Sequence, residues 1–357
     1  MPHSKSNLRI LVVRLGAMGD ILHALPAVTA LRAALPQSYI GWAVKPKWSE
    51  LLCAGGSDCH ARGAQMPLVD RLHFAPVETW APASLVPETW RQILALRREL
   101  RAEQYDVCLD LQGAVRSALL GTLSGTARKI GEASPRESLA RWFFTEKIQT
   151  RGRHVIEQAR EVAEAVLHQP LPSVAACLPQ DAEAEQWCTD MLQEYCIERF
   201  ILMNPGAGWG AKCWPAERYG QVAAALASKG YATILNAGPG EIVLAKQAQA
   251  ASQRKAIVLE CTLGQLIACT RRAQMFVGGD TGPLHLAAAL GRPVVGIFGP
   301  TDPERNGPFA TRARVLRHPE SRRNHARRKN PEAGLLTIQA EDVVQAVEDL
   351  LQQEAKA

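Results

Sequence analysis

The sequence has no apolar run long enough to span a bilayer and no cysteine pattern that would bind a metal. No stretch approaches the roughly 18 uncharged apolar residues that a transmembrane helix needs. The first apolar run, 8–15, carries two arginines and no small-residue cleavage site follows it, so we expect no signal peptide. The nine cysteines include no Cys-x-x-Cys pair. We therefore expect neither a disulfide framework nor a structural zinc site, and a protein that stays in a reducing cytoplasm.

Several catalytic signatures are also missing. The chain has no Gly-x-Ser-x-Gly elbow, no His-Glu-x-x-His motif and no Asp-x-Asp pair. The last absence argues against a diphosphate that is bridged by a metal ion. Wholesale disorder is excluded as well, because 47% of the residues are hydrophobic and only 21% are charged.

Positive charge is concentrated in one segment. The net charge is +6, but residues 312–329 hold eight Lys/Arg and one acidic residue, so the rest of the chain is slightly negative. This segment is either a solvated loop or a patch for phosphate-rich partners or an anionic membrane. Nucleic-acid binding is disfavoured, because no aromatic residues are interleaved with these charges.

The chain divides into two halves that are built alike. With 357 residues, about two domains are expected. Each half opens with an apolar strand, a glycine-bearing loop and a helical pattern, at 8–35 and at 199–230. Strand-like runs then alternate with helical stretches, which predicts parallel sheets covered on both faces. Those runs are 39–44, 107–111, 232–236, 275–277 and 294–298.

These patterns predict an α/β fold with two Rossmann-like, doubly wound domains that face a central cleft, where such folds bind ligands. We place the N-terminal domain at 1–170 and a proline-rich linker at 171–183. The second domain takes 184–335. The remainder, 336–357, is a C-terminal helix, which is amphipathic over 340–354.

The most informative stretch is 276–309. A strand ends at Gly278–Gly279, a tight turn follows at Asp280-Thr281-Gly282, and Pro283 opens a helix. The backbone N–H groups of this helix start, the Thr281 hydroxyl and the positive helix end would form an anion site, toward which His285 could point. The alternative is that Asp280 only caps the helix and His285 packs against it.

A second loop of interest is 204–215, which has three glycines and Lys212. The glycines let backbone approach a ligand and the lysine suits a phosphate, although an ordinary loop explains the pattern equally well. Glu241 follows the next strand of this half. It either binds the hydroxyls of a ribose or simply starts a surface helix.

The first half carries a similar loop at 14–27. Gly16 and Gly19 bracket a turn, and Asp20 stands at the start of a helix. Asp20 is either a helix cap or a general base toward a bound hydroxyl.

Together these motifs resemble glycosyltransferase family 9, the bacterial lipopolysaccharide heptosyltransferases, with details closer to type I than to type II. The resemblance spans nearly the whole chain. Its strongest parts are RLGAMGDILHALPA (14–27), DLQGAVRSALLG (110–121), PGAGWGAKCWP (205–215) and GDTGPLHLAAALGRPVVGIFGPTDP (279–303).

The resemblance implies a GT-B type enzyme that transfers L-glycero-D-manno-heptose from ADP-heptose, with inversion and without a metal or cofactor. The acceptor would be the Kdo region of nascent lipopolysaccharide core, of the Kdo-lipid A type. The enzyme would be cytoplasmic, peripheral on the inner face of the inner membrane, monomeric and without affinity for nucleic acid.

The resemblance also implies roles for individual residues. Asp20 matches the catalytic base of the family. The donor-binding residues would be Lys212, Glu241, Asp280, Thr281, Gly282 and His285. The acceptor-binding residues would be Asp110, Gln112, Arg116, Arg136 and Glu137.

The sequence departs from the family where acceptor phosphates are expected to bind. The region 74–90, which is usually basic, contains no Lys or Arg. The acceptor could therefore differ, and the basic segment 312–329 could replace the missing charge. Two other functions stay open: a transferase or epimerase of the same fold that uses another nucleotide-sugar, and a non-enzymatic binding protein.

Overall fold

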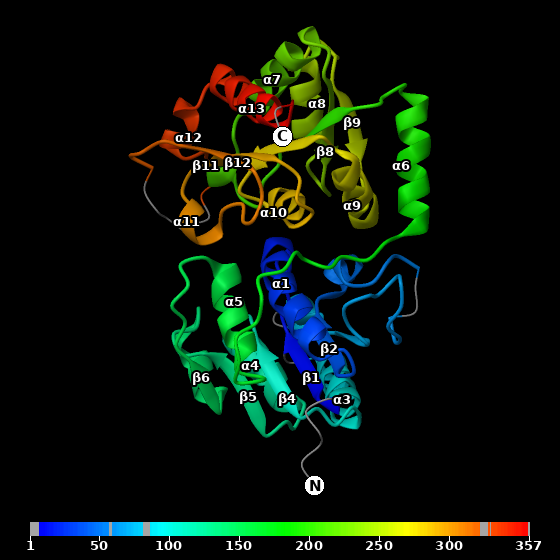
Figure 1. Ribbon diagram of the computed structural model, residues 1–357, viewed down its shortest axis with the longest axis vertical. Coiled ribbons are helices and arrows are strands. Elements are labelled where there is room, and N and C mark those ends of the chain that lie inside the picture. Colours follow the sequence, from blue (N-terminus) through cyan, green and yellow to red (C-terminus); the bar gives the residue numbers. More distant parts are fainter. Residues whose placement is uncertain (1–6, 57–58, 81–85, 322–327, 329, 356–357) are drawn as a thin grey trace. The chain divides into compact units, whose positions relative to one another are not determined.

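The computed structural model describes residues 7–56, 59–80, 86–321, 328 and 330–355. The chain divides into two compact units, Met1–Gln180 and Asp181–Ala357 (Figure 1). Each unit is a six-stranded sheet in which all paired strands run parallel, with helices packed against it.

The first unit has the strand order β3-β2-β1-β4-β5-β6. Its strands are β1 Arg9–Val13, β2 Tyr39–Val44, β3 Arg71–Phe74, β4 Val107–Asp110, β5 Arg128–Glu132 and β6 Glu146–Ile148. Its helices are α1 Met18–Ala34, α2 Val77–Trp80, α3 Pro87–Ala102, α4 Val115–Leu123 and α5 Val155–Glu164, with 3₁₀ turns η2 Pro46–Leu51 and η3 Ser138–Phe143.

The second unit repeats this topology, with the order β12-β11-β10-β7-β8-β9. Its strands are β7 Phe200–Asn204, β8 Ala232–Ala237, β9 Ile257–Glu260, β10 Met275–Gly279, β11 Val294–Phe298 and β12 Ala313–Arg317. Its helices are α6 Ala182–Glu194, α7 Ala216–Ser228, α8 Ile242–Ala251, α9 Leu263–Arg272, α10 Gly282–Ala289, α11 Pro303–Asn306, α12 Ala333–Thr337 and α13 Ala340–Ala355, with the 3₁₀ turn η4 Gly210–Lys212.

Both units therefore have the Rossmann strand order, which confirms the predicted fold class. The strand order reverses between β1 and β4 in the first unit and between β7 and β10 in the second. Ligands of doubly wound sheets bind outside the carboxyl ends of the strands at this switch point. The cleft between the domains and the linker at 171–183 stay predictions.

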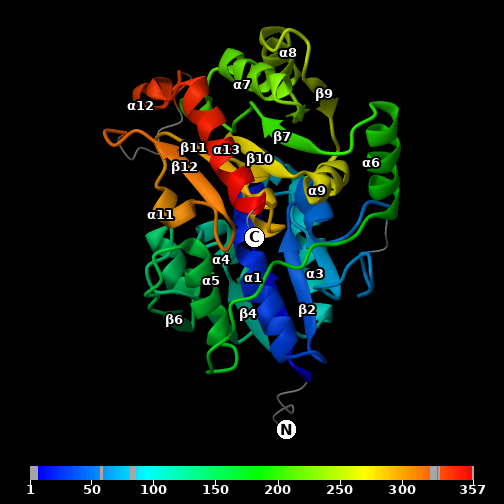
Figure 2. The ribbon, with the colours of Figure 1, turned by 45° about the horizontal axis from the view of Figure 1, so that its top comes forward.

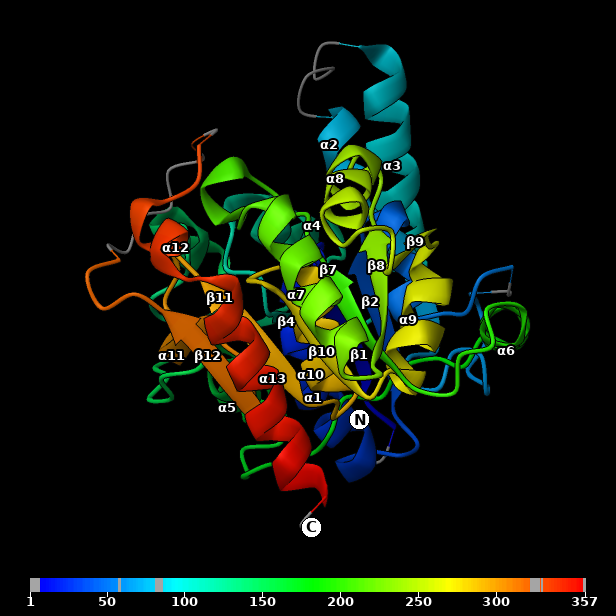
Figure 3. The same ribbon diagram turned by 90° about the horizontal axis from the view of Figure 1, so that it is seen from above.

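The core of the second unit joins its sheet to α7, α8 and α13. Figures 2 and 3 show α13 lying beside α7, and α13 also packs against β11 and β12. The Trp214 indole stacks edge-on against Tyr219 and donates to the carbonyl of Ile338 over 3.0 Å. The C-terminal helix is thus part of the core of the second unit.

Two sequence-based expectations need adjustment. Helix α1 begins at Met18, before Asp20, which accepts a hydrogen bond from the Ala17 N–H and so stands inside the first turn. The basic segment 312–329 is not a loop throughout, since residues 313–317 form the strand β12, which pairs with β11. Residues 322–327 and 329 of that segment lie outside the described residues.

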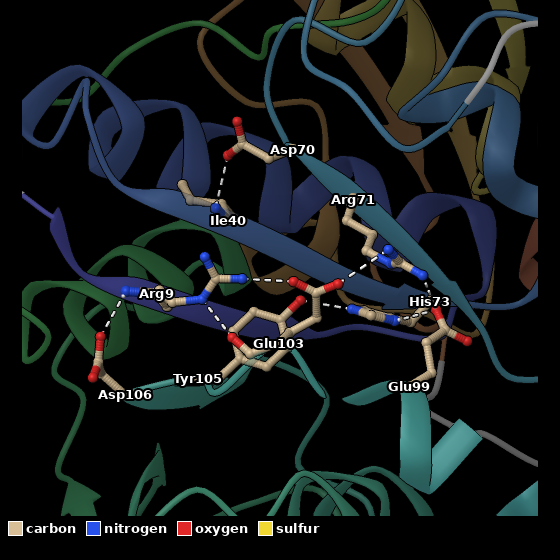
Figure 4. Close-up of polar contacts among 9 residues, drawn as sticks. All are labelled: Arg9, Ile40, Asp70, Arg71, His73, Glu99, Glu103, Tyr105 and Asp106. Carbon is tan, nitrogen blue, oxygen red and sulfur yellow. Dashed lines mark hydrogen bonds and ion pairs between the residues drawn. The ribbon is translucent and has the colours of Figure 1, made fainter. Parts of the chain in front are cut away.

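A polar network lies where β1 and β3 of the first unit begin (Figure 4). Glu103 bridges the guanidinium groups of Arg9 (2.6 Å) and Arg71 (3.0 Å). The buried His73 lies between Glu99 and Tyr105, 2.6 Å from each. These contacts connect α3 to the sheet. Arg9 and Arg71 are the first residues of their strands, so the network lies at the amino ends of the strands and not at the switch point.

The close packing of α7 on α8 depends on Gly220. A Cβ at this position would collide with the carbonyl oxygen of Ala248 and lie 2.5 Å from the Cβ of Ala251. Helix propensity alone would make Gly220→Ala stabilising by about 1 kcal/mol. We expect instead a loss of about 1–3 kcal/mol, because the two helices must separate. Urea unfolding measures the difference, and a variant as stable as wild type or more stable would contradict this packing.

Candidate active site

The switch point of the second unit brings together residues that are far apart in the sequence. Lys212 lies in the loop after β7, at the end of η4, and Asp280 follows β10. The Lys212 ammonium lies 2.5 Å from Oδ2 of Asp280 and 3.2 Å from its carbonyl oxygen. It also lies 4.9 Å from the centre of the Trp209 ring. The ion pair therefore links the glycine-rich loop to the turn before α10.

His285 completes this cluster from the first turn of α10. Its Nε2 lies 3.0 Å from Oδ1 of Asp280, and both side chains are buried. Burial alone would raise the pKa of Asp280, but the hydrogen bonds and charges of His285 and Lys212 hold it below its usual range. Asp280 is thus an ionised carboxylate between two nitrogen donors, rather than the simple helix cap of the alternative interpretation.

The turn after Asp280 presents backbone donors at a helix start. Thr281 is the N-cap of α10, and its side chain makes no capping bond. The first N–H groups of a helix have no acceptor within it. Pro283 has no N–H, so Gly282 and Leu284 supply the donors that we expected from the whole turn. This arrangement, with a positive helix end beside Lys212, suits an anionic ligand.

Glu241 lies against the same glycine-rich loop. Its Oε2 accepts a hydrogen bond from Gly238 N–H over 3.2 Å. A Cβ at Gly206 would overlap the Glu241 carboxylate, so a larger residue there would displace that carboxylate from its present position. The loops after β7 and β8 therefore meet at Gly206 and Glu241.

Two buried asparagines, which were not predicted from the sequence, hold the loop after β7 in place. Asn236, in β8, donates to the Asn204 side chain over 2.6 Å, and Asn204 donates to the carbonyl of Gly206 over 3.0 Å. An asparagine near the end of each of two adjacent apolar strands was the available signal.

In the first unit, Asp20 is held at the switch point by Arg14. The Arg14 guanidinium lies 3.1 Å from Asp20 Oδ1 and donates to the carbonyl of Leu111, at the end of β4. The other carboxylate oxygen of Asp20 accepts from Ala17 N–H. The Asp20 side chain is still 32% exposed, so a ligand hydroxyl can reach it. The role of Arg14 was not predicted. The available signal was a charged residue that ends an apolar strand just before a glycine turn.

Gln112 fastens the loop after β4 to the loop after β1. Its side chain accepts from Leu15 N–H over 2.9 Å and donates to the carbonyl of Gly16 over 3.1 Å. Asp110 in turn accepts from the N–H groups of Gln112 and Gly113, both over 2.8 Å. Burial raises the pKa of Asp110 to about 6, although these N–H donors oppose the shift. Both side chains thus shape the loops around Asp20.

The other acceptor-side candidates surround the start of α4. Arg116 is exposed on its first turn, and Arg136 is exposed in the loop after β5. Glu137 accepts from Val115 N–H over 2.9 Å and its own N–H donates to Gly113. The structure therefore brings Arg116, Arg136 and Glu137 to the end of β4, close to the Asp110 turn.

No group of three or more His, Cys, Asp or Glu side chains that could hold a metal ion occurs among the described residues. Across the same part of the chain, no helix is long and apolar enough to cross a bilayer.

Two Rossmann-like units, one with a lysine and a helix start at its switch point, place the chain among the doubly wound α/β proteins. The profile of glycosyltransferase family 9 (heptosyltransferase) matches residues 93–336, which is more than half of the chain. The chain belongs to this family, and it is a glycosyltransferase.

Individual relatives agree with this assignment. The chain is 28% identical to lipopolysaccharide heptosyltransferase 1 of Escherichia coli strain K12, over 87% of this chain and 94% of the relative. It superposes on the structure of E. coli heptosyltransferase WaaC with ADP with a TM-score of 0.78, 27% identity, and coverage of 96% and 99% of the two chains. A structure of WaaC with ADP-2-deoxy-2-fluoro heptose gives a TM-score of 0.76 at the same identity, with coverage of 96% and 100%.

The Asp280 cluster predicts a specific dependence of stability on pH. Because the folded-state pKa of Asp280 lies below the ordinary value of 3.8, its ionised form contributes stability above that pH and loses this contribution as the pH falls below it. Asp280→Asn should lower the free energy of unfolding by about 3–5 kcal/mol at neutral pH, since it leaves Lys212 without its partner. Urea unfolding should show this difference shrinking below about pH 4. The exposed Asp190→Asn is the control, and a loss that is equal at both pH values would contradict the cluster.

Proposed function

We propose that this chain transfers L-glycero-D-manno-heptose from ADP-heptose to the Kdo region of lipopolysaccharide core, with inversion and without a metal ion. The observation that carries the proposal is the Lys212–Asp280–His285 cluster beside the start of α10, in a member of the heptosyltransferase family. Support for the donor comes from WaaC, whose structures carry ADP and a fluorinated ADP-heptose.

The donor site can stabilise a leaving diphosphate with the chain's own groups. The Lys212 ammonium has three hydrogens, and the two oxygens of Asp280 that it contacts leave one for a phosphate. The Gly282 and Leu284 N–H groups add neutral donors. The Thr281 hydroxyl donates to the Gly279 carbonyl over 3.3 Å and would have to turn toward the phosphate. Fixed donors of this kind act where negative charge builds up in the transition state. Glu241 would bind the ribose hydroxyls.

Asp20 would act as the general base. The acceptor hydroxyl gives its proton to the Asp20 carboxylate while its oxygen forms the bond to the anomeric carbon. The bond from that carbon to the diphosphate breaks at the same time, and ADP leaves with the electron pair. Arg14 holds the carboxylate in place, while Arg116, Arg136 and Glu137 would bind the acceptor.

A lipid-anchored acceptor would place the protein, as a monomer, at the cytoplasmic face of the inner membrane. The basic segment 312–329 is one candidate for the contact. Two of its described arginines already have partners in the fold. Arg317 donates to the carbonyls of Gly299 and Ser321, and Arg314 lies 3.8 Å from Asp349. The charges left for a membrane are mainly those of residues 322–329.

The direct test incubates the full chain with ADP-heptose and a panel of Kdo-bearing acceptors and measures the mass of the products. The proposal expects acceptors that gain one heptose, with release of ADP. Protection by ADP against heating, without turnover of ADP-heptose, would indicate another nucleotide-sugar instead.

Asp20→Asn should lower kcat by about 10²–10⁴-fold, because the hydroxyl keeps its proton as the new bond forms. ADP affinity should stay unchanged, since Asp20 belongs to the first unit. Steady-state kinetics and an ADP titration of the same preparation check both expectations. A kcat close to that of wild type would reject Asp20 as the base.

Lys212→Ala should both lower kcat and weaken ADP binding, because the ammonium contacts the diphosphate before and during its departure. Lys212→Arg keeps the positive charge, so it should retain part of the turnover and part of the ADP affinity. Wild-type turnover should be unaffected by EDTA. Loss of turnover in EDTA, with recovery on adding Mg²⁺, would contradict departure without a metal.

A further inference from the structure

The two most exposed large apolar side chains of the described residues lie together on one short helix of the first unit. They are Leu139, which is 64% exposed, and Trp142, which is 70% exposed, and both belong to η3. Large apolar side chains that face water in a group mark interaction surfaces. Neither side chain has a part in the site described above.

The geometry of η3 fixes both side chains on one face. A 3₁₀ helix has three residues per turn, so side chains three apart are eclipsed, as Leu139 and Trp142 are. The other side of this segment is anchored, because Ala140 and Phe144 form a small core with Ala118 of α4. The apolar pair is thus presented by a packed element of the fold.

Positive charge surrounds this pair. The Arg141 guanidinium lies 5.1 Å and the Lys147 ammonium 5.8 Å from the centre of the Trp142 ring, and both residues are exposed. Residues 128–153 hold seven Lys/Arg against three Glu. Each of these glutamates already has a partner within the fold: Glu132 binds Thr150, Glu137 binds Val115 N–H and Glu146 binds Arg128.

We propose that η3 docks the protein on an anionic lipid bilayer. Leu139 and Trp142 enter the headgroup region, where the amphipathic indole of tryptophan is favoured. Arg141 and Lys147 remain level with the lipid phosphates and are attracted by their charge. Two apolar side chains give a shallow, reversible attachment. The two charged groups that lie against the Trp142 ring, Arg141 and Lys147, are both positive, which favours an anionic bilayer as the partner.

The position of η3 also suits the proposed reaction. It starts directly after Arg136 and Glu137, which we assign to the acceptor side. Docking there would bring a lipid-anchored acceptor to that side. This last step rests on the proposed function, but the docking itself does not.

Co-sedimentation of the full chain with vesicles tests the docking without any substrate. Vesicles of phosphatidylcholine with added phosphatidylglycerol should bind the wild type, and binding should weaken at high salt and without the anionic lipid. The double variant Leu139→Ser, Trp142→Ser and the double variant Arg141→Gln, Lys147→Gln should each bind about tenfold or more weakly. A cooperative thermal unfolding transition close to the wild-type Tm in every variant would show that it is folded.

Two controls match the variants in exposure and charge. Val243→Ser removes an apolar side chain that is 63% exposed on α8, and Arg254→Gln, Lys255→Gln removes two exposed charges of the second unit. Both should bind as wild type does. The proposal would be overturned if both η3 variants bound vesicles as tightly as the wild type. A further variant changes Arg322, Arg323, Arg327 and Arg328 to Ser, and a loss of vesicle binding in this variant alone would also overturn it. A change from dimer to monomer in the Trp142 variant would assign the surface to self-association. Vesicle binding without heptose transfer would overturn only the proposed function.

Discussion

The ion pair between Lys212 and Asp280 is the contact on which the second unit's site depends. It joins the loop after β7 to the turn after β10, and His285 holds the same carboxylate from α10. Since Asp280 is almost fully buried, its charge is stable only while both partners are present. One contact therefore fixes the position of the ammonium, the turn and the helix start that would receive a diphosphate.

The first unit uses the same topology for a different task. Its switch point also joins the loops after the first and fourth strands, but the link there is made by Arg14 and Gln112 instead of a buried ion pair. Asp20 stays partly exposed as a result, which suits a group that must exchange a proton with a ligand. Two copies of one strand order would thus support, in the proposed function, one site for a diphosphate and one for proton transfer.

The glycine loops and most strands next to the switch points could be predicted from the sequence, because apolar runs and turn residues are local signals. The strands β3, β5, β6 and β9 were not predicted, since all four are short and β5 and β6 also carry charges within the run. The state of Asp280 could not, since an aspartate before a helix is equally a cap, and only the fold brings Lys212 to it from 68 residues away. The strand β12 could not be predicted, because its arginines dominate the local pattern and indicate equally a solvated loop or a charged patch. At the edge of the sheet, those residues pair with β11 while their long side chains reach other partners. Arg14 escaped notice because its partners, Asp20 and Leu111, meet it only in the folded sheet.

A crystal structure of the chain with bound ADP would locate the donor site. We expect the diphosphate within hydrogen-bond distance of the Lys212 ammonium and of the N–H groups at the start of α10, with the ribose at Glu241 and no metal ion between phosphate and protein. A diphosphate bound elsewhere, or one held by a metal ion, would contradict this expectation.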